Sequence, residues 1–354
     1  NLLIVESRET ERGPLLAELE ALAGVCDPAT KVIVVGESND ITLYRELIRQ
    51  GISEYLMAPL HPMQVIEAIA SLYSAPESDP IGKIFAFVGA KGGSGSSTIA
   101  HNFAWSLATQ IGIASTLVDL DLPFGTAGLD FNQDPAQGVA DALLAPERLD
   151  DVLLERLLVR ASDRLHLFAA PAVLDRDYDI DPQAFETVMD IVRSSSPAVV
   201  VDVPHGWNAW TRQTLMTADE IIVTATPDLA SLRNAKNIYD VFAGARPNDA
   251  KPRLILNQVG VVKRPEIPVK DFAEAIGADP ILVLPFDPQL FGTAANNGQM
   301  IAQLNPQSRA AQGFQHVARL LTGRETIADP KAKKGESIFK FLSALNKKPL
   351  RKAG

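Results

Sequence analysis

The sequence predicts an α/β fold built on a mostly parallel, doubly wound sheet. Two observations carry this prediction. Between residues 83 and 325, short apolar runs alternate with helix-like stretches, an order that places helices on both faces of a parallel sheet. Clusters of Gly, Asp and Asn directly follow several of these runs. They would therefore lie at the carboxyl ends of the strands, where open α/β sheets bind ligands.

The first element of this region is a strand, a loop and a helix. An apolar run at 84–88 (IFAFV) leads into KGGSGSST at 91–98, and a helix-like stretch covers 99–110. Glycine tolerates positive φ, so successive N–H groups can face an anion, and the helix adds its positive N-terminal end. The segment predicts a phosphate-binding loop. Its expected contacts are Gly92, Gly93, Ser94, Gly95, Ser96, Ser97 and Thr98.

This loop departs from the usual P-loop pattern at two positions. Ala90 replaces the first glycine, and Ser96 replaces the lysine that reaches the β- and γ-phosphates. Ser97 keeps the hydroxyl that binds Mg²⁺, and Lys91 stands at the front of the loop. We therefore expect the loop to bind a nucleotide with Mg²⁺ but to support slow hydrolysis at most, and the alternative is a glycine-rich turn without a ligand.

Two apolar strands end in acids. Residues 115–121 (STLVDLD) carry Asp119 and Asp121, and residues 198–204 (AVVVDVP) carry Asp202. An aspartate after a strand is more often a solvated strand end than a ligand, so each acid alone is weak evidence. Three later segments continue the alternation: EIIVTATP at 220–227 with a helix opening at 231–237, RLILNQ at 253–258, and ILVLPFD at 281–287 with AANNG at 294–298.

In this order and spacing, the motifs of residues 82–323 resemble the ParA/MinD class of P-loop ATPases. The resemblance implies that Ser97, Asp119 and Asp202 support the metal and that Asp121 orients the attacking water. Lys91 would reach across an ATP-sandwich homodimer to the partner's phosphates. Asn257, Pro285 and Asp287 would bind the adenine base of the nucleotide, and residues 294–298 would form a loop that closes over this base.

Residues 1–75 predict a smaller α/β region. Its expected elements are strands at 1–6 and 31–36, a helix at 41–49 and the segment GISEYLMAP at 51–59. This order resembles the second half of a flavodoxin-like receiver domain. Glu6 stands in place of the phosphoacceptor Asp, Gly36 in place of the switch hydroxyl, and Ala58 in place of the lysine. We expect a non-phosphorylatable pseudo-receiver that mediates contacts, the alternative being an unrelated fragment that packs on the ATPase. Residues 76–82 are expected to form a linker.

Composition and charge argue against several classes of function. The single cysteine, Cys26, argues against a disulfide framework and against an iron–sulfur enzyme. The five histidines lack metal-ligand spacing, and we expect packing or surface roles for them. The net charge is −10, but residues 331–354 hold eight Lys or Arg and one acid. The acidic remainder argues against nucleic acid as the partner.

The basic tail, residues 326–354, predicts an amphipathic helix at 336–347 (ESIFKFLSALNK). Such a helix suits an anionic inner-membrane surface or a partner groove, and the plainer alternative is a helix docked on its own domain. Trp207 and Trp210 follow the 198–204 strand and are either partner anchors or core residues.

A pseudo-receiver before a MinD-like ATPase with a small residue at position 96 resembles the TadZ/CpaE proteins. That resemblance implies an ATP-dependent dimer that recruits components of a Tad (Flp) pilus secretion machine. It would be cytoplasmic, polar and peripheral to the inner membrane. The alternatives are a DNA-partition ATPase, a regulator of division or flagellar placement, and a metabolic or redox enzyme of the same P-loop superclass.

Overall fold

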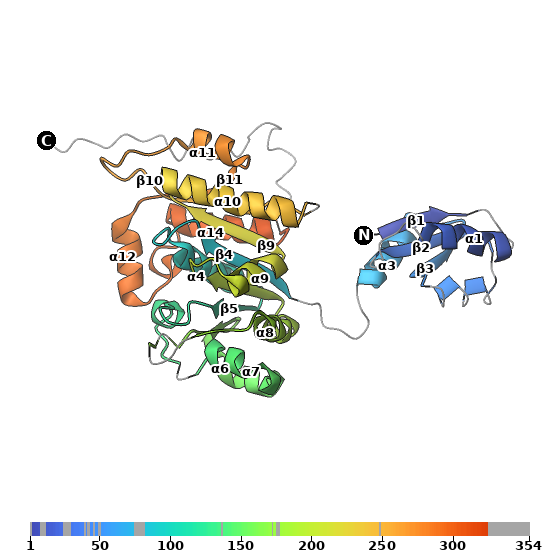
Figure 1. Ribbon diagram of the computed structural model, residues 1–354, viewed down its shortest axis with the longest axis horizontal. Coiled ribbons are helices and arrows are strands. Elements are labelled where there is room, and N and C mark those ends of the chain that lie inside the picture. Colours follow the sequence, from blue (N-terminus) through green and yellow to red (C-terminus); the bar gives the residue numbers. More distant parts are fainter. Residues whose placement is uncertain are drawn as a thin grey trace. The chain divides into compact units, whose positions relative to one another are not determined.

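The computed structural model describes residues 2–7, 12–23, 30–38, 40, 43–44, 47–48, 51–73, 82–135, 137–171, 173–174, 178–247 and 249–324. The chain divides into two compact units, Asn1–Pro80 and Ile81–Gly354 (Figure 1). Three expectations fall largely or wholly outside the described residues. They are most of the helix at 41–49, the linker at 76–82 apart from Gly82, and the basic tail at 326–354.

The first unit contains a parallel sheet of three strands in the order β1-β2-β3. Its elements are β1 (Leu2–Glu6), α1 (Arg12–Ala23), β2 (Lys31–Gly36), β3 (Glu54–Met57) and α3 (Pro62–Tyr73). Val34 of β2 packs with Leu15 and Leu19 of α1 and with Leu43 and Leu47. This small cluster forms because alternate side chains of a strand point to the same face.

The second unit contains an eight-stranded sheet in the order β11-β10-β9-β4-β8-β5-β7-β6. The strands are β4 (Lys83–Gly89), β5 (Ser115–Asp119), β6 (Val159–Ser162), β7 (Leu165–Phe168), β8 (Ala198–Val203), β9 (Glu220–Ala225), β10 (Arg253–Val259) and β11 (Pro280–Pro285). Neighbouring strands are parallel except β6 and β7, which form an antiparallel pair at one edge. The predicted α/β fold with a mostly parallel sheet is confirmed.

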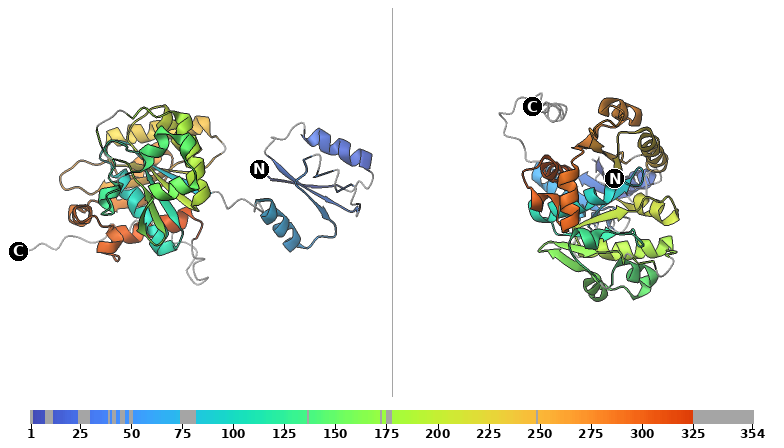
Figure 2. Two further views of the ribbon diagram at one scale, coloured as in Figure 1. Left: turned by 90° about the horizontal axis from the view of Figure 1, so that it is seen from below. Right: turned by 90° about the vertical axis from the view of Figure 1, so that its left-hand side faces the viewer.

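Helices cover both faces of this sheet (Figures 1 and 2). They are α4 (Ser96–Ser106), α5 (Ala127–Asp130), α6 (Val139–Leu144), α7 (Asp151–Leu157), α8 (Pro182–Ser195), α9 (Ala209–Thr217), α10 (Leu229–Ala245), α11 (Val269–Ile276), α12 (Pro288–Asn297), α13 (Ile301–Leu304) and α14 (Arg309–Leu321). Phe85 and Phe87 of β4 pack in the cluster that includes α4 and α14. Ala86 and Val88 pack in the opposite cluster, with α8 and α10. The apolar run at 84–88 is therefore explained by burial on both sides.

Two local expectations differ from the structure. The segment 294–298, expected as a loop, forms the end of α12, and Gly298 caps it in a left-handed conformation (φ 59°). Asp287 caps the start of α12, and Pro288 occupies its first turn, a combination that initiates helices. The helix expected at 99–110 begins at Ser96 and ends in a π-helical turn, Leu107–Ile111.

Candidate nucleotide-binding site

The glycine-rich loop joins β4 to α4 and is held at both ends. Its start is fixed by the N–H of Ala90, which donates to the Thr224 carbonyl of β9 (2.8 Å). Gly93 and Gly95 have φ values of 76° and 86°, a region that favours glycine. At Gly95 a Cβ atom would also lie 2.4 Å from Nδ2 of Asn257. The positive φ therefore favours glycine at position 95, and a Cβ there would also displace the Asn257 amide.

The start of α4 has the properties of an anion site. Gly95 is its N-cap, and no side chain of the described residues caps it. The Oγ of Ser96 is buried and has no hydrogen-bond partner among those residues. The first N–H groups of a helix lack intrahelical acceptors and lie at its positive end. A phosphate group would satisfy these donors, and the adjacent half-buried Ser97 would present its hydroxyl beside it.

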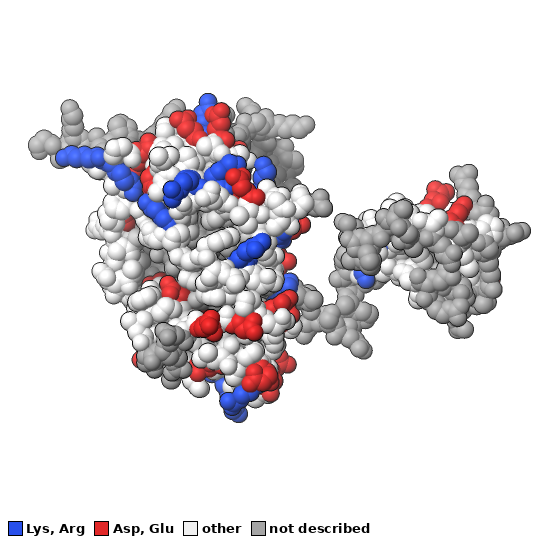
Figure 3. Space-filling view, viewed as in Figure 1, with Lys and Arg blue, Asp and Glu red and all other residues white. Residues whose placement is uncertain are grey.

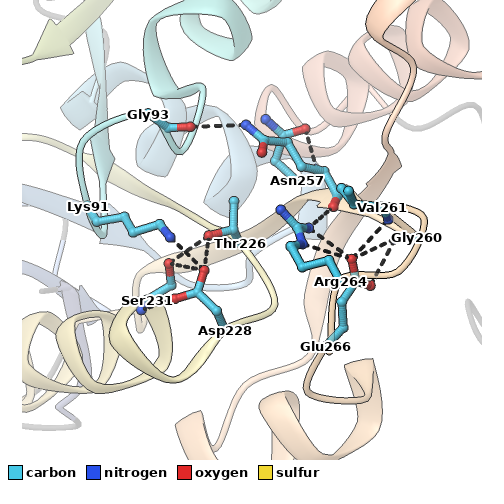
Figure 4. Close-up of polar contacts among 11 residues, drawn as sticks. Lys91, Gly93, Thr226, Asp228, Ser231, Asn257, Gly260, Val261, Arg264 and Glu266 are labelled. Carbon is cyan, nitrogen blue, oxygen red and sulfur yellow. Dashed lines mark hydrogen bonds and ion pairs between the residues drawn. The ribbon is translucent and has the colours of Figure 1, made fainter.

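Lys91 is turned toward α10 rather than toward the helix start (Figure 4). Its Nζ lies 2.7 Å from Oδ2 of Asp228, and this oxygen also accepts a hydrogen bond from the Thr226 hydroxyl. The other oxygen of Asp228, Oδ1, accepts the Ser231 N–H. Burial alone would raise the pKa of Asp228, but the hydrogen bonds from Lys91, Thr226 and Ser231 outweigh it and lower the pKa to about 2. The lysine at the front of the loop therefore contacts the N-cap residue of α10.

Asp119 and Asp202 lie side by side at the ends of β5 and β8. One oxygen of Asp119 accepts the N–H of Asp121 (3.1 Å), and the other accepts the N–H of Ala127 (3.0 Å). Burial, and then the charge of Asp202, raise the pKa of Asp119. Asp119 is thus occupied in fixing the loop that follows β5. A Cβ on Gly125 would lie 2.5 Å from its Oδ2, so the loop passes close to this carboxylate.

Asp121 belongs to the same loop but is only partly buried. Its Oδ1 accepts the N–H of Phe124 (3.3 Å), and burial raises its pKa. Asp202 is almost fully buried in β8. The structure therefore brings three predicted acids to neighbouring strand ends.

His101 is a site residue that sequence reasoning missed. It is fully buried in α4, with Nδ1 2.7 Å from Oδ2 of Asp130 and Nε2 3.6 Å from Oδ2 of Asp202. Burial opposes its charged form, but the contacts with Asp130 and then Asp202 raise the pKa of His101 to about 10. The imidazole therefore lies buried between the carboxylates of Asp130 and Asp202. No local sequence signal indicates this role, because both acids are distant from His101 along the chain.

Asn257 lies at the end of β10 and contacts the glycine-rich loop directly. Its Nδ2 donates to the Ser94 carbonyl (2.8 Å), and Nε2 of Gln258 donates to the Gly93 carbonyl (3.0 Å). The turn that follows is closed by Glu266, whose carboxylate accepts the N–H groups of Gly260 and Val261 (Figure 4). Asn257, which the sequence predicts to bind the nucleotide base, therefore lies beside the glycine-rich loop.

Pro285 and Asp287 lie in a groove beside α12. They line a groove of about 650 Å³ together with α12 and residues 304–310. Asp287 caps α12 by accepting the Leu290 N–H (3.0 Å). Neither residue has a described hydrogen bond to the glycine-rich loop, so their base-binding role stays a prediction.

The two tryptophans after β8 have different environments. Trp207 is 52% exposed, as a partner anchor would require. Trp210 packs against the core near Phe185, with ring centroids 6.5 Å apart. His205, between β8 and α9, contacts the Gly89 carbonyl through Nδ1 (3.0 Å).

These features define a P-loop nucleotide-binding protein. The residues present fit a phosphate group at the start of α4, while Asp119 is less suited to a metal because both its oxygens already accept N–H groups. A family model described as an AAA domain matches residues 82–252. The septum site-determining protein MinD of Synechocystis sp. is 25% identical over 251 residues, covering 69% of this chain and 90% of MinD.

Solved structures agree with this match. A ParA family ATPase from Chlorobium tepidum is 28% identical, with a TM-score of 0.61, covering 67% of this chain and 98% of its own. MinD of Pyrococcus horikoshii, complexed with Mg-ADP, is 23% identical, with a TM-score of 0.59, covering 71% of this chain and 99% of its own. The second unit is therefore similar in sequence and fold to MinD and ParA ATPases.

A pilus assembly protein CpaE from Caulobacter crescentus is 57% identical but aligns with 20% of this chain and 58% of its own, at a TM-score of 0.20. This partial match carries no argument for a pilus role.

Proposed function

We propose that this chain binds Mg·ATP and dimerises on it as a scaffold that localises a Tad (Flp) pilus assembly machine at the cell pole, with slow hydrolysis at most. The observation that carries the nucleotide site is the start of α4, where no described side chain caps the helix and the buried Ser96 hydroxyl has no partner among the described residues. Buried polar groups are nearly always satisfied in native proteins, so this cluster of donors favours an anionic ligand.

The proposed role of each site residue follows from its position in the fold. Residues 92–98 hold the phosphates through backbone N–H groups, and Asn257 holds the base next to Ser94. Ser97 binds Mg²⁺, with Asp202 behind it, and Asp121 orients the attacking water. Asp119 supports the loop that carries Asp121. Mg²⁺, when bound, neutralises phosphate charge during transfer.

Dimerisation through the nucleotide face is supported by exposed apolar side chains on segments tied to the site. Leu229 follows Asp228 in α10 and is 73% exposed, and Val262 lies in the turn after Gln258 and is 80% exposed. Phe124 and Trp207 are also exposed. Large exposed apolar side chains next in sequence to site residues favour a protein partner. A second copy would cover them and would bring the partner's Lys91 to the phosphates.

Slow turnover follows from Ser96. By analogy with the loss of a single transition-state donor, the missing lysine lowers the rate by about 10²–10³. Calorimetry with ATP, with and without Mg²⁺, tests binding, and sedimentation with ATP tests dimerisation. We expect saturable Mg²⁺-dependent binding, an ATP-dependent dimer and a kcat far below 1 s⁻¹. A kcat of about 1 s⁻¹ or more, typical of efficient enzymes, would contradict a slow switch.

The pilus role rests on the resemblance of the two units together. The first unit supports a pseudo-receiver that cannot be phosphorylated. A Cβ at Gly36 would lie 2.5 Å from the Tyr55 hydroxyl, which is itself held by the backbone of Ser38. The Tyr55 side chain therefore fills the space that a switch hydroxyl at position 36 would need. A fluorescent fusion of the full chain should form a polar focus that persists with pilus components present and disperses without them.

The alternative is a MinD/ParA-like positioning ATPase for DNA partition, division or flagellar placement. DNA partition predicts a basic surface on the ATPase body. On the visible face of the second unit, Lys and Arg lie mainly on the side of α10 and α11, and Asp and Glu predominate near α6 and α7 (Figure 3). DNA binding by the full chain with a steep salt dependence would favour partition over the scaffold.

Contact with the inner membrane would involve residues 326–354, outside the described part. No helix among the described residues is long and apolar enough to cross a bilayer. Binding of the full chain to anionic vesicles, and not to neutral ones, would support a role for the tail.

A further inference from the structure

Two side-chain amides at the end of β10 hold two successive carbonyls of the glycine-rich loop. Nδ2 of Asn257 donates to the Ser94 carbonyl (2.8 Å), and Nε2 of Gln258 donates to the Gly93 carbonyl (3.0 Å). The C=O and the N–H of one planar trans peptide point in opposite directions. Each contact therefore also turns the next N–H of the loop away from β10.

The direction of these N–H groups decides whether the loop attracts an anion. The Ser94 N–H closes a turn on the Lys91 carbonyl (3.3 Å), and Gly95, whose N–H comes next, is the N-cap of α4. Successive N–H groups that face one side attract phosphate, whereas a carbonyl turned to that side repels it. Glycine leaves the loop backbone free to rotate, so contacts from outside the loop are what hold its peptides in one orientation.

Gln258 makes its contact from a strained backbone conformation. Its φ is 54°, in the left-handed region that a residue of this kind rarely adopts. The turn that follows fixes this conformation: Arg264 donates to the Gln258 carbonyl and to Glu266, and Glu266 accepts the Gly260 N–H (2.8 Å) (Figure 4). Burial alone would raise the pKa of Glu266, but hydrogen bonds from backbone N–H groups and from Arg264 lower it. Strain that surrounding contacts enforce in this way is typical of functional sites.

We propose that Gln258 is a positioning residue of the nucleotide site: fixed by Arg264 and Glu266, its amide orients the glycine-rich loop so that N–H groups, and not carbonyls, face the polyphosphate of the ligand. This inference rests on the proposed function, because it needs a polyphosphate at the loop. Oδ1 of Asn257 accepts the Gln258 N–H (2.8 Å), so the two amides form one clamp. Gln258 then acts on the phosphates and not on the base.

Calorimetry with two ligands, Mg·ATP and Mg·tripolyphosphate, tests this role, because tripolyphosphate has no base. Gln258→Met keeps the length of the side chain and removes the donor. We expect it to weaken the binding of both ligands by the same factor, about three- to tenfold, as the loss of one neutral hydrogen bond implies. Gln183→Met, at an exposed position in the first turn of α8, is the matched control and should bind both ligands as the wild type does.

A glycine variant separates the amide from the backbone conformation. Gln258→Gly adopts the left-handed conformation without strain and also lacks the amide. It should lose as much affinity as Q258M, although its melting temperature should be no lower than that of Q258M. A loss of affinity through the backbone alone would instead be absent from Q258G.

The contribution of Glu266 is tested by Glu266→Gln, which removes the charge that holds Arg264. We expect about threefold weaker binding of both ligands, and Glu274→Gln, at an exposed acid of α11, is its control. Because Glu266 acts through Gln258, the double variant Q258M/E266Q should lose no more affinity than Q258M. If E266Q does not fold, Q258M and Q258G carry the test, because they leave the contacts of Glu266 in place.

The outcomes distinguish this inference from the proposed function. Wild-type affinity in Q258M or Q258G would overturn the inference and leave the nucleotide site standing. A loss confined to Mg·ATP, or a wild-type chain that binds Mg·ATP and not Mg·tripolyphosphate, would also overturn it, as would additive losses in the double variant. A wild-type chain that binds neither ligand would refute the proposed function and this inference together.

Discussion

The ion pair between Lys91 and Asp228 leads to a sharp prediction. Lys91 can reach a partner's phosphate only after it leaves Asp228, so the pair opposes ATP-dependent dimerisation. Asp228→Asn removes the negative charge and keeps the side-chain oxygen that caps α10 at Ser231. We expect this substitution to tighten the ATP-dependent dimer.

The expected change in the dimer dissociation constant follows from the exposed fractions of the Lys91 and Asp228 side chains. The two side chains are 36% and 28% exposed, and partly exposed ion pairs contribute about 0.5–1 kcal/mol. A symmetric dimer breaks two such pairs, about 1–2 kcal/mol, which corresponds to about a 5- to 30-fold lower dissociation constant. Because the pKa of Asp228 is depressed to about 2, its stabilising effect is complete above about pH 4 and is lost as the pH falls toward 2. At neutral pH the pair is fully formed.

Sedimentation at several protein concentrations, with saturating Mg·ATP, measures the dissociation constant. Asp240→Asn is the matched control, because it removes a carboxylate from the same helix at the pair with Lys236, away from the loop. An unchanged or weaker dimer in D228N, with an unaltered melting temperature and a silent D240N, would refute the idea that Asp228 restrains Lys91.

Three further predictions concern the loop. Lys91→Ala should abolish ATP-dependent dimerisation in sedimentation while ATP affinity stays within about threefold, because the backbone N–H groups remain. Gly95→Ala should weaken ATP binding at least tenfold by calorimetry, because residue 95 has a left-handed conformation and its new Cβ would lie 2.4 Å from Asn257. Gly244→Ala in α10 is the control: its Cβ would meet nothing within 4 Å, so ATP affinity should not change. Ser96→Lys should raise kcat about 10²- to 10³-fold in a phosphate-release assay, and an unchanged rate would show that Ser96 does not limit turnover.

The sequence predicted the glycine-rich loop and the sheet because both are decided by neighbours close along the chain. Positive φ at Gly93 and Gly95 and two-sided burial of 84–88 follow from local pattern. The role of Asp119 was harder to predict. A strand-end acid suggests a metal ligand, but its oxygens are taken by the N–H groups of Asp121 and Ala127. That arrangement depends on how the chain folds back after β5.

The contacts of His101 could not be predicted from the local sequence pattern. Its two acids are 29 and 101 residues away, in α5 and β8, and the helix that holds it is apolar on the same side. A lone histidine in an apolar stretch predicts packing, and only the folded sheet brings the acids to it. The same limit applies to Asp228, which has no spacing relation to Lys91 and meets it because β9 lies beside β4.

Lys91 and His101 both have acidic partners. Lys91 is held by Asp228, and His101 is enclosed by Asp130 and Asp202. With serine at position 96, no lysine of the same loop lies behind the phosphates. Phosphoryl transfer needs positive charge on the γ-phosphate, and bound Mg²⁺ supplies only part of it. The missing charge would then come from Lys91 of the partner subunit, released when the dimer forms. On this proposal, a monomer would bind nucleotide without hydrolysing it, and dimerisation rather than binding would start hydrolysis.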